Sequence, residues 1–132
     1  MFADEIIALL EAKGIGVFGT NMFVGSKAII PVGDGPFLVV VETGGTGATR
    51  VQNQKGAKTR RPTAQVSVRG ASGPTSRVMA EEAYQALDGV TNELIAGTFY
   101  QSITVRGDLA NLGEDDSGRT FLSFNIDAER QP

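Results

Sequence analysis

The feature that most restricts the fold is a run of five apolar residues, 37–41, that contains three valines. Turn-forming residues precede the run, and a glycine-rich stretch follows it. β-Branched residues favour the extended backbone of a strand, and both faces of this strand are apolar. The run therefore predicts a central strand that is covered on both sides. A chain of 132 residues has the length of one domain, which we expect to span residues 1–132.

Two other segments have the periodicity of amphipathic helices. In residues 2–13 apolar side chains recur at three- and four-residue steps, two carboxylates occupy the first turn, and Gly14 follows the last turn. Residues 76–95 carry a second apolar stripe and are predicted to form a helix. Gly89 could interrupt this helix, because glycine has a low helix propensity. This stripe consists of Met79, Ala83, Leu87, Val90 and Leu94.

The remaining pattern predicts strands. Residues 64–69, 99–106 and 119–127 contain alternating apolar and polar side chains, which is typical of strands with one buried face. Short strands are also expected at 15–17 and 27–30. The strands at 99–106 and 119–127 should pair as antiparallel neighbours, since most consecutive strands do. The order of elements predicts an α+β fold, a mostly antiparallel β-sheet with two helices packed on one face.

The composition excludes several classes of function. The chain has neither cysteine nor histidine, so it lacks disulfides, thiolate and imidazole metal ligands, and the usual general base near pH 7. We therefore predict a binding protein and not an enzyme, with no catalytic residue, no cofactor and no metal site. The longest apolar run is far shorter than the about 20 residues of a spanning helix, and Asp4 and Glu5 lie where a signal peptide is basic. No membrane partner is expected.

Three short motifs resemble ligand sites but lack the required context. Residues 14–19 spell G-x-G-x-x-G, yet a helix is expected before them and strands after them, which is the reverse of a dinucleotide site. Residues 44–47 are glycine-rich, but the Gly-Lys-Ser/Thr of a phosphate-binding loop does not follow in register. Residues 114–118 are acidic, but their oxygen atoms do not have the spacing of a calcium loop. We interpret all three as turns or loops.

Charge is divided unevenly along the chain. The net charge is −3 for residues 1–42, +7 for residues 43–80, where no acid occurs, and −7 for residues 81–132. Residues 43–62 combine the glycine-rich stretch with five bases and lack periodicity, so we expect a long Gly-rich, basic loop there. Such loops are often functional, and a bipolar surface suits contact with complementary charge. The predicted interface residues are the bases Arg50, Lys55, Lys58, Arg60 and Arg61 and the acids Glu114, Asp115 and Asp116.

Four segments in the second half of the chain together resemble one protein family. They are a strand led by Pro62 with Gln65-Val66-Ser67-Val68-Arg69, the helix that contains Leu87, a strand that begins Gly97-Thr98-Phe99-Tyr100, and a turn with Leu112-Gly113-Glu114-Asp115 and Gly118-Arg119. In this order they resemble the minor capsid and tail terminator proteins of long-tailed bacteriophages. The resemblance covers residues 62–127, and Asp116 is an extra acidic residue in the turn.

The resemblance implies a structural virion protein without enzymatic activity. Such proteins form a ring, which we expect to be a homohexamer, at the head-proximal end of the tail tube. The ring stops polymerisation of the tube and joins the tail to the connector at the neck. The implied partners are further copies of the chain, the tail tube protein, the head–tail connector and, transiently, the passing DNA. The implied location is the tail and neck of the virion, after synthesis in the host cytoplasm.

Three alternatives remain open from the sequence. The first is another neck or head–tail completion protein. The second is a non-specific nucleic-acid-binding module that uses the basic residues 50–61, although no aromatic residue lies between positions 43 and 83 to stack on bases. The third is a small hydrolase with paired carboxylates, but no such pair lies in an apolar setting that would raise one pKa.

Overall fold

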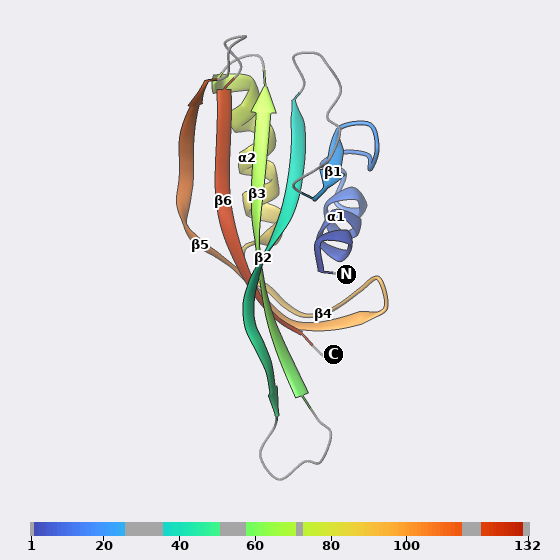
Figure 1. The fold of residues 1–132 in the computed structure, drawn as a ribbon. Coiled ribbons are helices and arrows are strands. Elements are labelled where there is room, and N and C mark those ends of the chain that lie inside the picture. The colour runs from blue at the N-terminus through green and yellow to red at the C-terminus, as the bar shows by residue number, and fades with distance from the viewer. Residues whose placement is uncertain (1, 26–35, 51–57, 71–72, 115–119, 131–132) are drawn as a thin grey trace.

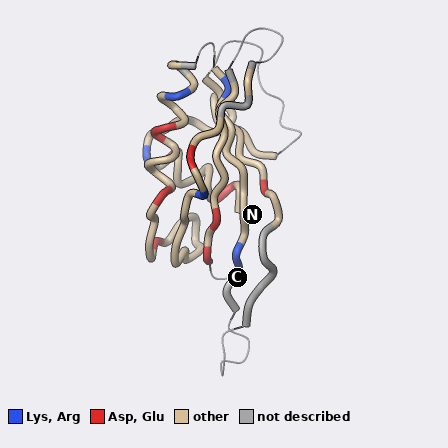
Figure 2. The backbone as a smooth tube through the Cα atoms, turned by 90° about the vertical axis from the view of Figure 1, so that its left-hand side faces the viewer, with Lys and Arg blue, Asp and Glu red and all other residues tan. Residues whose placement is uncertain are grey.

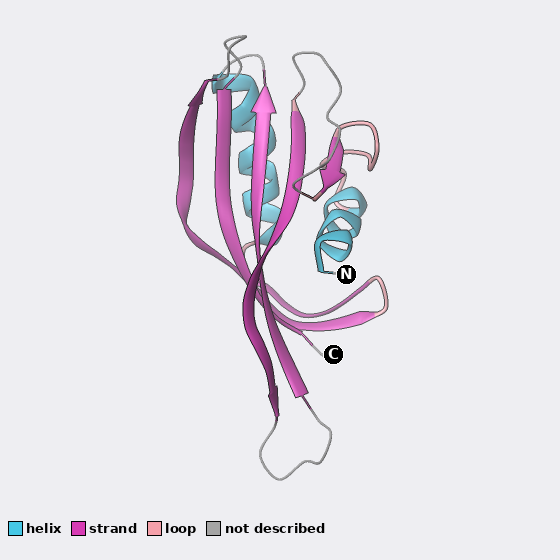
Figure 3. Cartoon of the chain, in the orientation of Figure 1, coloured by secondary structure: helices cyan, strands magenta, loops and turns pink. Residues whose placement is uncertain are grey.

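The computed structural model describes residues 2–25, 36–50, 58–70, 73–114 and 120–130. It consists of one sheet with two helices on one of its faces (Figure 1; Figure 3). The predicted α+β fold is thereby confirmed. The elements are α1 (Phe2–Ala12), β1 (Met22–Val24), β2 (Phe37–Arg50), β3 (Lys58–Gly70), α2 (Gly73–Leu87), β4 (Val90–Ile95), β5 (Thr98–Glu114) and β6 (Thr120–Arg130).

The strands lie in the order β1-β2-β3-β6-β5-β4. Every pair of neighbours is antiparallel except β1 and β2, which are parallel. The predicted antiparallel pairing of the last two strands of the chain, β5 and β6, is confirmed. The lower part of the sheet is strongly curled, so that the β4–β5 hairpin bends beneath α1 in Figure 1.

The core lies between the sheet and the two helices. In the register of the sheet Leu38 is opposite Val68, and Val68 is opposite Leu122, so all three side chains share one face. This face is fully buried: α1 packs on β1, β2 and β4, whereas α2 packs on β3, β6 and β5. The sheet face on which α2 packs carries five buried residues, which are Val66, Val68, Val105, Leu122 and Phe124.

A buried carboxylate fixes α1 to the other end of the chain. Glu5 is only 8% exposed and accepts hydrogen bonds from the hydroxyls of Thr98 and Tyr100, each at 2.5 Å. Arg130 at the end of β6 forms an ion pair with the same carboxylate at 3.4 Å. Because a buried charge is stable only when it is paired and hydrogen-bonded, these contacts determine how α1 sits against β5 and β6.

The first helix otherwise agrees with its prediction. It ends at Ala12, one residue before the expected end, and Gly14 has a φ of +78°, the left-handed conformation that ends many helices. The prediction of a strand at 15–17 is wrong, because the first strand, β1, begins at Met22. The segment 27–30, where a second short strand is expected, lies outside the described residues.

Residues 37–41 do form a strand, but the prediction that both of its faces are covered is wrong. Leu38 and Val40 are buried beneath α1, whereas Val39 and Val41 are half-buried on the opposite face of the sheet. Both helices lie on the same face, so nothing in the described chain covers the second face of β2. The open face of the sheet is therefore available to solvent or to a partner.

The prediction of a long loop at residues 43–62 is also wrong for the residues of this range that the structure describes. Residues 43–50 continue β2 and residues 58–62 begin β3, and the two segments pair with each other; residues 51–57 lie outside the described chain. Periodicity could not reveal these strands because glycine and threonine replace the apolar residues that normally mark a buried face. We call residues 43–50 together with 58–62 the basic arm, which projects below the body of the molecule (Figure 1).

The second helix is shorter than predicted. It ends at Leu87, and residues 90–95, expected to continue it, form β4. Gly89 has a φ of +83°, which is incompatible with a continuing helix. The strand expected at 99–106 is longer than predicted and continues to Glu114, because β5 still pairs with β6 beyond a bulge after Arg106.

Leu87 is fully buried at the end of α2, so truncation of its side chain should leave a cavity. We expect Leu87→Ala to lower the free energy of unfolding by about 2–5 kcal/mol, measured by urea denaturation or as a fall in Tm. Gln85→Ala, an exposed position of the same helix, serves as the control and should change stability little. An unchanged Tm for Leu87→Ala would contradict the packing of α2 described above.

Stability should also depend on the ionisation of Tyr100. Burial, together with the hydrogen bond to Glu5, raises the pKa of Tyr100 well above its ordinary value of about 10. The resulting stabilisation is complete below about pH 10 and decreases as the pH rises further, by about 1.4 kcal/mol per pH unit, because only the unfolded chain then loses this proton. Urea denaturation between about pH 9 and pH 11 should show a shallower decline for Tyr100→Phe than for Tyr84→Phe. Equal declines would contradict this assignment.

Candidate assembly interface

The basic arm carries four of the five predicted basic interface residues. Arg50 and Lys58 are register partners at the far end of the described arm, and Arg60 and Arg61 follow on β3 close to the body. Lys55 lies outside the described residues. The arm projects from the body in Figure 1, and Figure 2 shows in red and blue that acidic and basic residues are both distributed over that body. The structure thus brings Arg50, Lys58, Arg60 and Arg61 onto one projecting element.

Arg60 and Arg61 are neighbours in β3 and therefore point to opposite faces of the strand. Arg61 lies on the open face, where its Nε atom is 3.2 Å from Oε1 of Glu129 on β6. Both side chains of this pair are about half exposed, at 50% and 43%. Arg60 is exposed and lies opposite Arg130 in the register of β3 and β6. The two arginines therefore present positive charge to two different sides of the arm.

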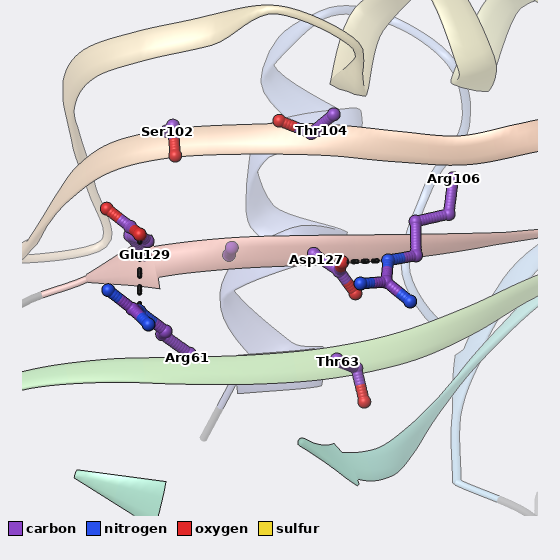
Figure 4. A pocket seen from close by; sticks show the side chains of 8 residues that line it. Arg61, Thr63, Ser102, Thr104, Arg106, Asp127 and Glu129 are labelled. Atoms are coloured by element: carbon purple, nitrogen blue, oxygen red, sulfur yellow. Dashed lines mark ion pairs between the residues drawn. The ribbon is translucent and has the colours of Figure 1, made fainter. Parts of the chain in front are cut away.

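A polar groove crosses the open face of the sheet where the arm meets the body. Its volume is about 600 Å³, and β3, β5 and β6 supply its walls. Two ion pairs span neighbouring strands, Arg61 with Glu129 and Arg106 with Asp127, and they lie one after the other along β6 in Figure 4. The remaining polar side chains of the lining are Thr63, Ser102 and Thr104. Because each arginine has a carboxylate partner, the groove is polar but has no excess charge.

Glu114, the one predicted acidic residue that the structure describes, lies far from the basic arm. Glu114 is the last residue of β5 and pairs in register with Thr120, next to the end of β3 at Gly70. Asp115 and Asp116 lie outside the described residues. The 12 residues that separate Lys58 from Gly70 on β3 correspond to about 40 Å of extended strand. Glu114 and the far end of the basic arm are therefore at opposite ends of the sheet and cannot contact each other within one subunit.

The groove residues on β6 were not predicted from the sequence. The signal was present, because Asn125, Asp127 and Glu129 alternate with Ile126 and Ala128 at the spacing of a strand with one wet face. The expected strand ended at residue 127, so Glu129 was not recognised as part of it. Register, which brings Glu129 beside Arg61, depends on the pairing of strands that are distant in sequence and is not readable from one segment.

The described residues contain no group of three or more Asp or Glu side chains placed to hold a metal ion. They also contain no helix with the length and apolar character needed to cross a membrane.

Comparison with known proteins identifies the family. The sequence model of the bacteriophage tail terminator protein family matches residues 9–132. The chain belongs to this family. The resemblance inferred from residues 62–127 is therefore confirmed, and it extends over most of the first half of the chain. Like other tail terminators, the protein is a structural component of the phage tail and thus of the virion.

Solved structures share the fold of this tail terminator at low sequence identity. A chain in the virion of a native gene transfer agent particle aligns with a TM-score of 0.59 and 10% identity, covering 98% of this chain and 90% of that chain. A second solved chain aligns with a TM-score of 0.52 and 16% identity, covering 96% of this chain and 91% of that chain. A search among curated proteins gives no significant match.

The pair between Arg61 and Glu129 should contribute little to the stability of the subunit, because water reaches both side chains. We expect Arg61→Gln to lower the free energy of unfolding by no more than about 1 kcal/mol in chemical denaturation. Arg60→Gln, at the neighbouring exposed position, should have a similarly small effect. A loss well beyond about 1 kcal/mol for Arg61→Gln alone would mean that the pair is a structural element of the fold.

Proposed function

We propose that this tail terminator assembles into a ring, which we expect to be a homohexamer, on the head-proximal end of the tail tube. The ring stops polymerisation of the tube and joins the tail to the connector at the neck. The observation that carries this proposal is the membership of the tail terminator family over residues 9–132. The distribution of charge along the chain agrees with it, because one segment of 38 residues, 43–80, holds seven bases and no acid.

The position of the charges favours contacts between subunits. Glu114 and the basic arm lie at opposite ends of the sheet, so attraction between them acts from one subunit to another. Contacts between two different surfaces of the same chain are heterologous, and they close into a ring when the rotation between subunits permits. Exposed ion pairs contribute only about 0–1 kcal/mol each, so their role is to set the register of the subunits while apolar contacts supply most of the affinity.

The proposed partners are further copies of the chain, the tail tube protein and the head–tail connector, with transient contact to DNA that passes through the ring. Assembly takes place after synthesis in the host cytoplasm. The described structure does not favour a nucleic-acid-binding module, because the carboxylate of Glu129 lies beside Arg61 and that of Asp127 lies beside Arg106. We propose no catalytic residue and no cofactor.

Reversal of charge at the base of the arm tests this function. The variant with both Arg60→Glu and Arg61→Glu should fold as the wild type does, because both side chains are exposed, but it should form fewer rings or cap fewer tails. Native mass spectrometry measures the assembly, and electron microscopy measures the length of tails completed with the variant. Arg77→Glu, an exposed arginine on α2, is the control for a change of charge outside the arm.

Three results would separate the possible roles of the arm. Loss of the ring with a folded monomer would assign Arg60 and Arg61 to the contact between subunits. A ring that forms but does not cap tails would assign them to the contact with the tube or connector. Normal rings and normal tails in the double variant would rule out both roles.

A further inference from the structure

The curled half of the sheet has two free edges. β1 pairs with residues 38–40 of β2, and no other described residue pairs with the outer edge of β2 from Val41 to Arg50. At the other end of the sheet, β5 is the one strand of the described chain that pairs with β4. Exposed edge strands carry unpaired backbone donors and acceptors and readily pair with another chain. In a protein that assembles, two such edges are candidates for the contact.

The edge at β4 is lined by an apolar groove. This groove has a volume of about 340 Å³ and lies between α1 and β4, with walls formed by Ala8, Leu9, Ala12, Lys13, Glu93, Leu94, Ile95 and Ala96. Leu94 is 69% exposed, the highest value among the exposed large hydrophobic residues of the described chain. A groove between a helix and an edge strand is the geometry in which proteins bind an added strand.

One polar atom at this groove lacks a partner. The Oε2 atom of Glu93 is buried and forms no hydrogen bond within the described part of the chain. A buried carboxylate oxygen is destabilising until a donor reaches it, and a positively charged donor forms the strongest such bond. The described part of the basic arm contains four such donors, Arg50, Lys58, Arg60 and Arg61, and no acid.

We propose that β4 of one subunit pairs with the outer edge of β2, in the basic arm, of the next subunit. This inference rests on the proposed ring. The arm is suited to the groove because residues 43–49 are only glycine, alanine and threonine, which allow close approach to the small side chains of Ala8, Ala12 and Ala96. The contact joins two different surfaces, and repetition around a ring leaves neither edge uncovered.

The topology also defines the direction of the pairing. Four antiparallel steps, through β3, β6 and β5, separate β2 from β4, so these two strands have the same sense in the order of the sheet. A sheet that continues from one subunit to the next with this sense pairs β4 with the neighbouring β2 in parallel. An isologous dimer through either edge would instead place identical strands antiparallel.

Cysteine cross-linking tests the contact directly, because the chain has no cysteine of its own. We would combine Leu94→Cys in turn with Glu42→Cys, Thr43→Cys and Thr46→Cys, positions that sample both faces of β2. Disulfides require Cα atoms about 4.4–6.8 Å apart, so oxidation of assembled rings should produce a ladder of covalent oligomers for at least one pair. Val78→Cys on α2, an exposed position away from both edges, replaces Leu94→Cys in the control pairs and should give no ladder.

The outcomes distinguish failure of the contact from failure of the ring. If the wild-type protein forms rings but none of the three pairs gives a ladder, the contact is wrong and the ring remains. If the wild-type protein stays monomeric at all concentrations, alone and with tail tubes, both proposals are wrong. A covalent dimer from Leu94→Cys alone, without larger species from the pairs, would indicate an isologous contact and would also overturn the inference.

A charge at the groove provides a second measurement. Leu94→Lys should weaken ring formation at least about tenfold in the concentration needed for assembly, because it places a charge on the edge that a strand must cover. Val78→Lys makes the same kind of change at a position that is 60% exposed on α2, and it should assemble as the wild type does. Thermal unfolding checks that both variants are folded. Equal assembly by Leu94→Lys and the wild type would overturn the inference.

Discussion

One-sided burial of the sheet is the constraint on which the rest of this structure depends. Both helices cover the same face of the six strands, and the alternation of side chains assigns every second residue of β3 and β6 to that face. The charged side chains of the opposite face have no helix above them and pair with one another. In cross-strand ion pairs such as Arg61 with Glu129, the carboxylate balances the positive charge of the arginine. The same constraint leaves the sheet edges and the basic arm without cover.

The buried carboxylate of Glu5 complements this arrangement. The apolar contacts of α1 with β1 and β2 hold the helix against the sheet, but such contacts are not directional. Hydrogen bonds from Thr98 and Tyr100, together with the ion pair to Arg130, require one orientation of the helix relative to the curled end of the sheet. The groove beside β4 has its shape because α1 is held in this way.

The sequence predicted those parts of the fold that are determined by local pattern. The alternation in β3 and β6 and the stripe that includes Leu87 gave the core and the fold class correctly, because burial of apolar side chains enforces these periods. The basic arm was not predicted as strand, since Gly44, Gly45 and Thr46 are held extended by pairing with β3 and not by burial. At the interface, Arg60 and Arg61 were recognised from charge, whereas Glu129 and the edge at β4 required register and topology that no single segment contains.

The ion pair between Glu5 and Arg130 has a consequence for the time at which the subunit matures. These residues are 125 positions apart, so α1 cannot acquire all of its contacts until the ribosome has synthesised residue 130. Contacts of such long sequence separation form late and slow the folding of a chain. The side of the molecule built by α1 and β4 is thus incomplete on a nascent chain. This delay separates translation from assembly, because a chain still attached to the ribosome lacks the finished surface that a neighbour would have to recognise.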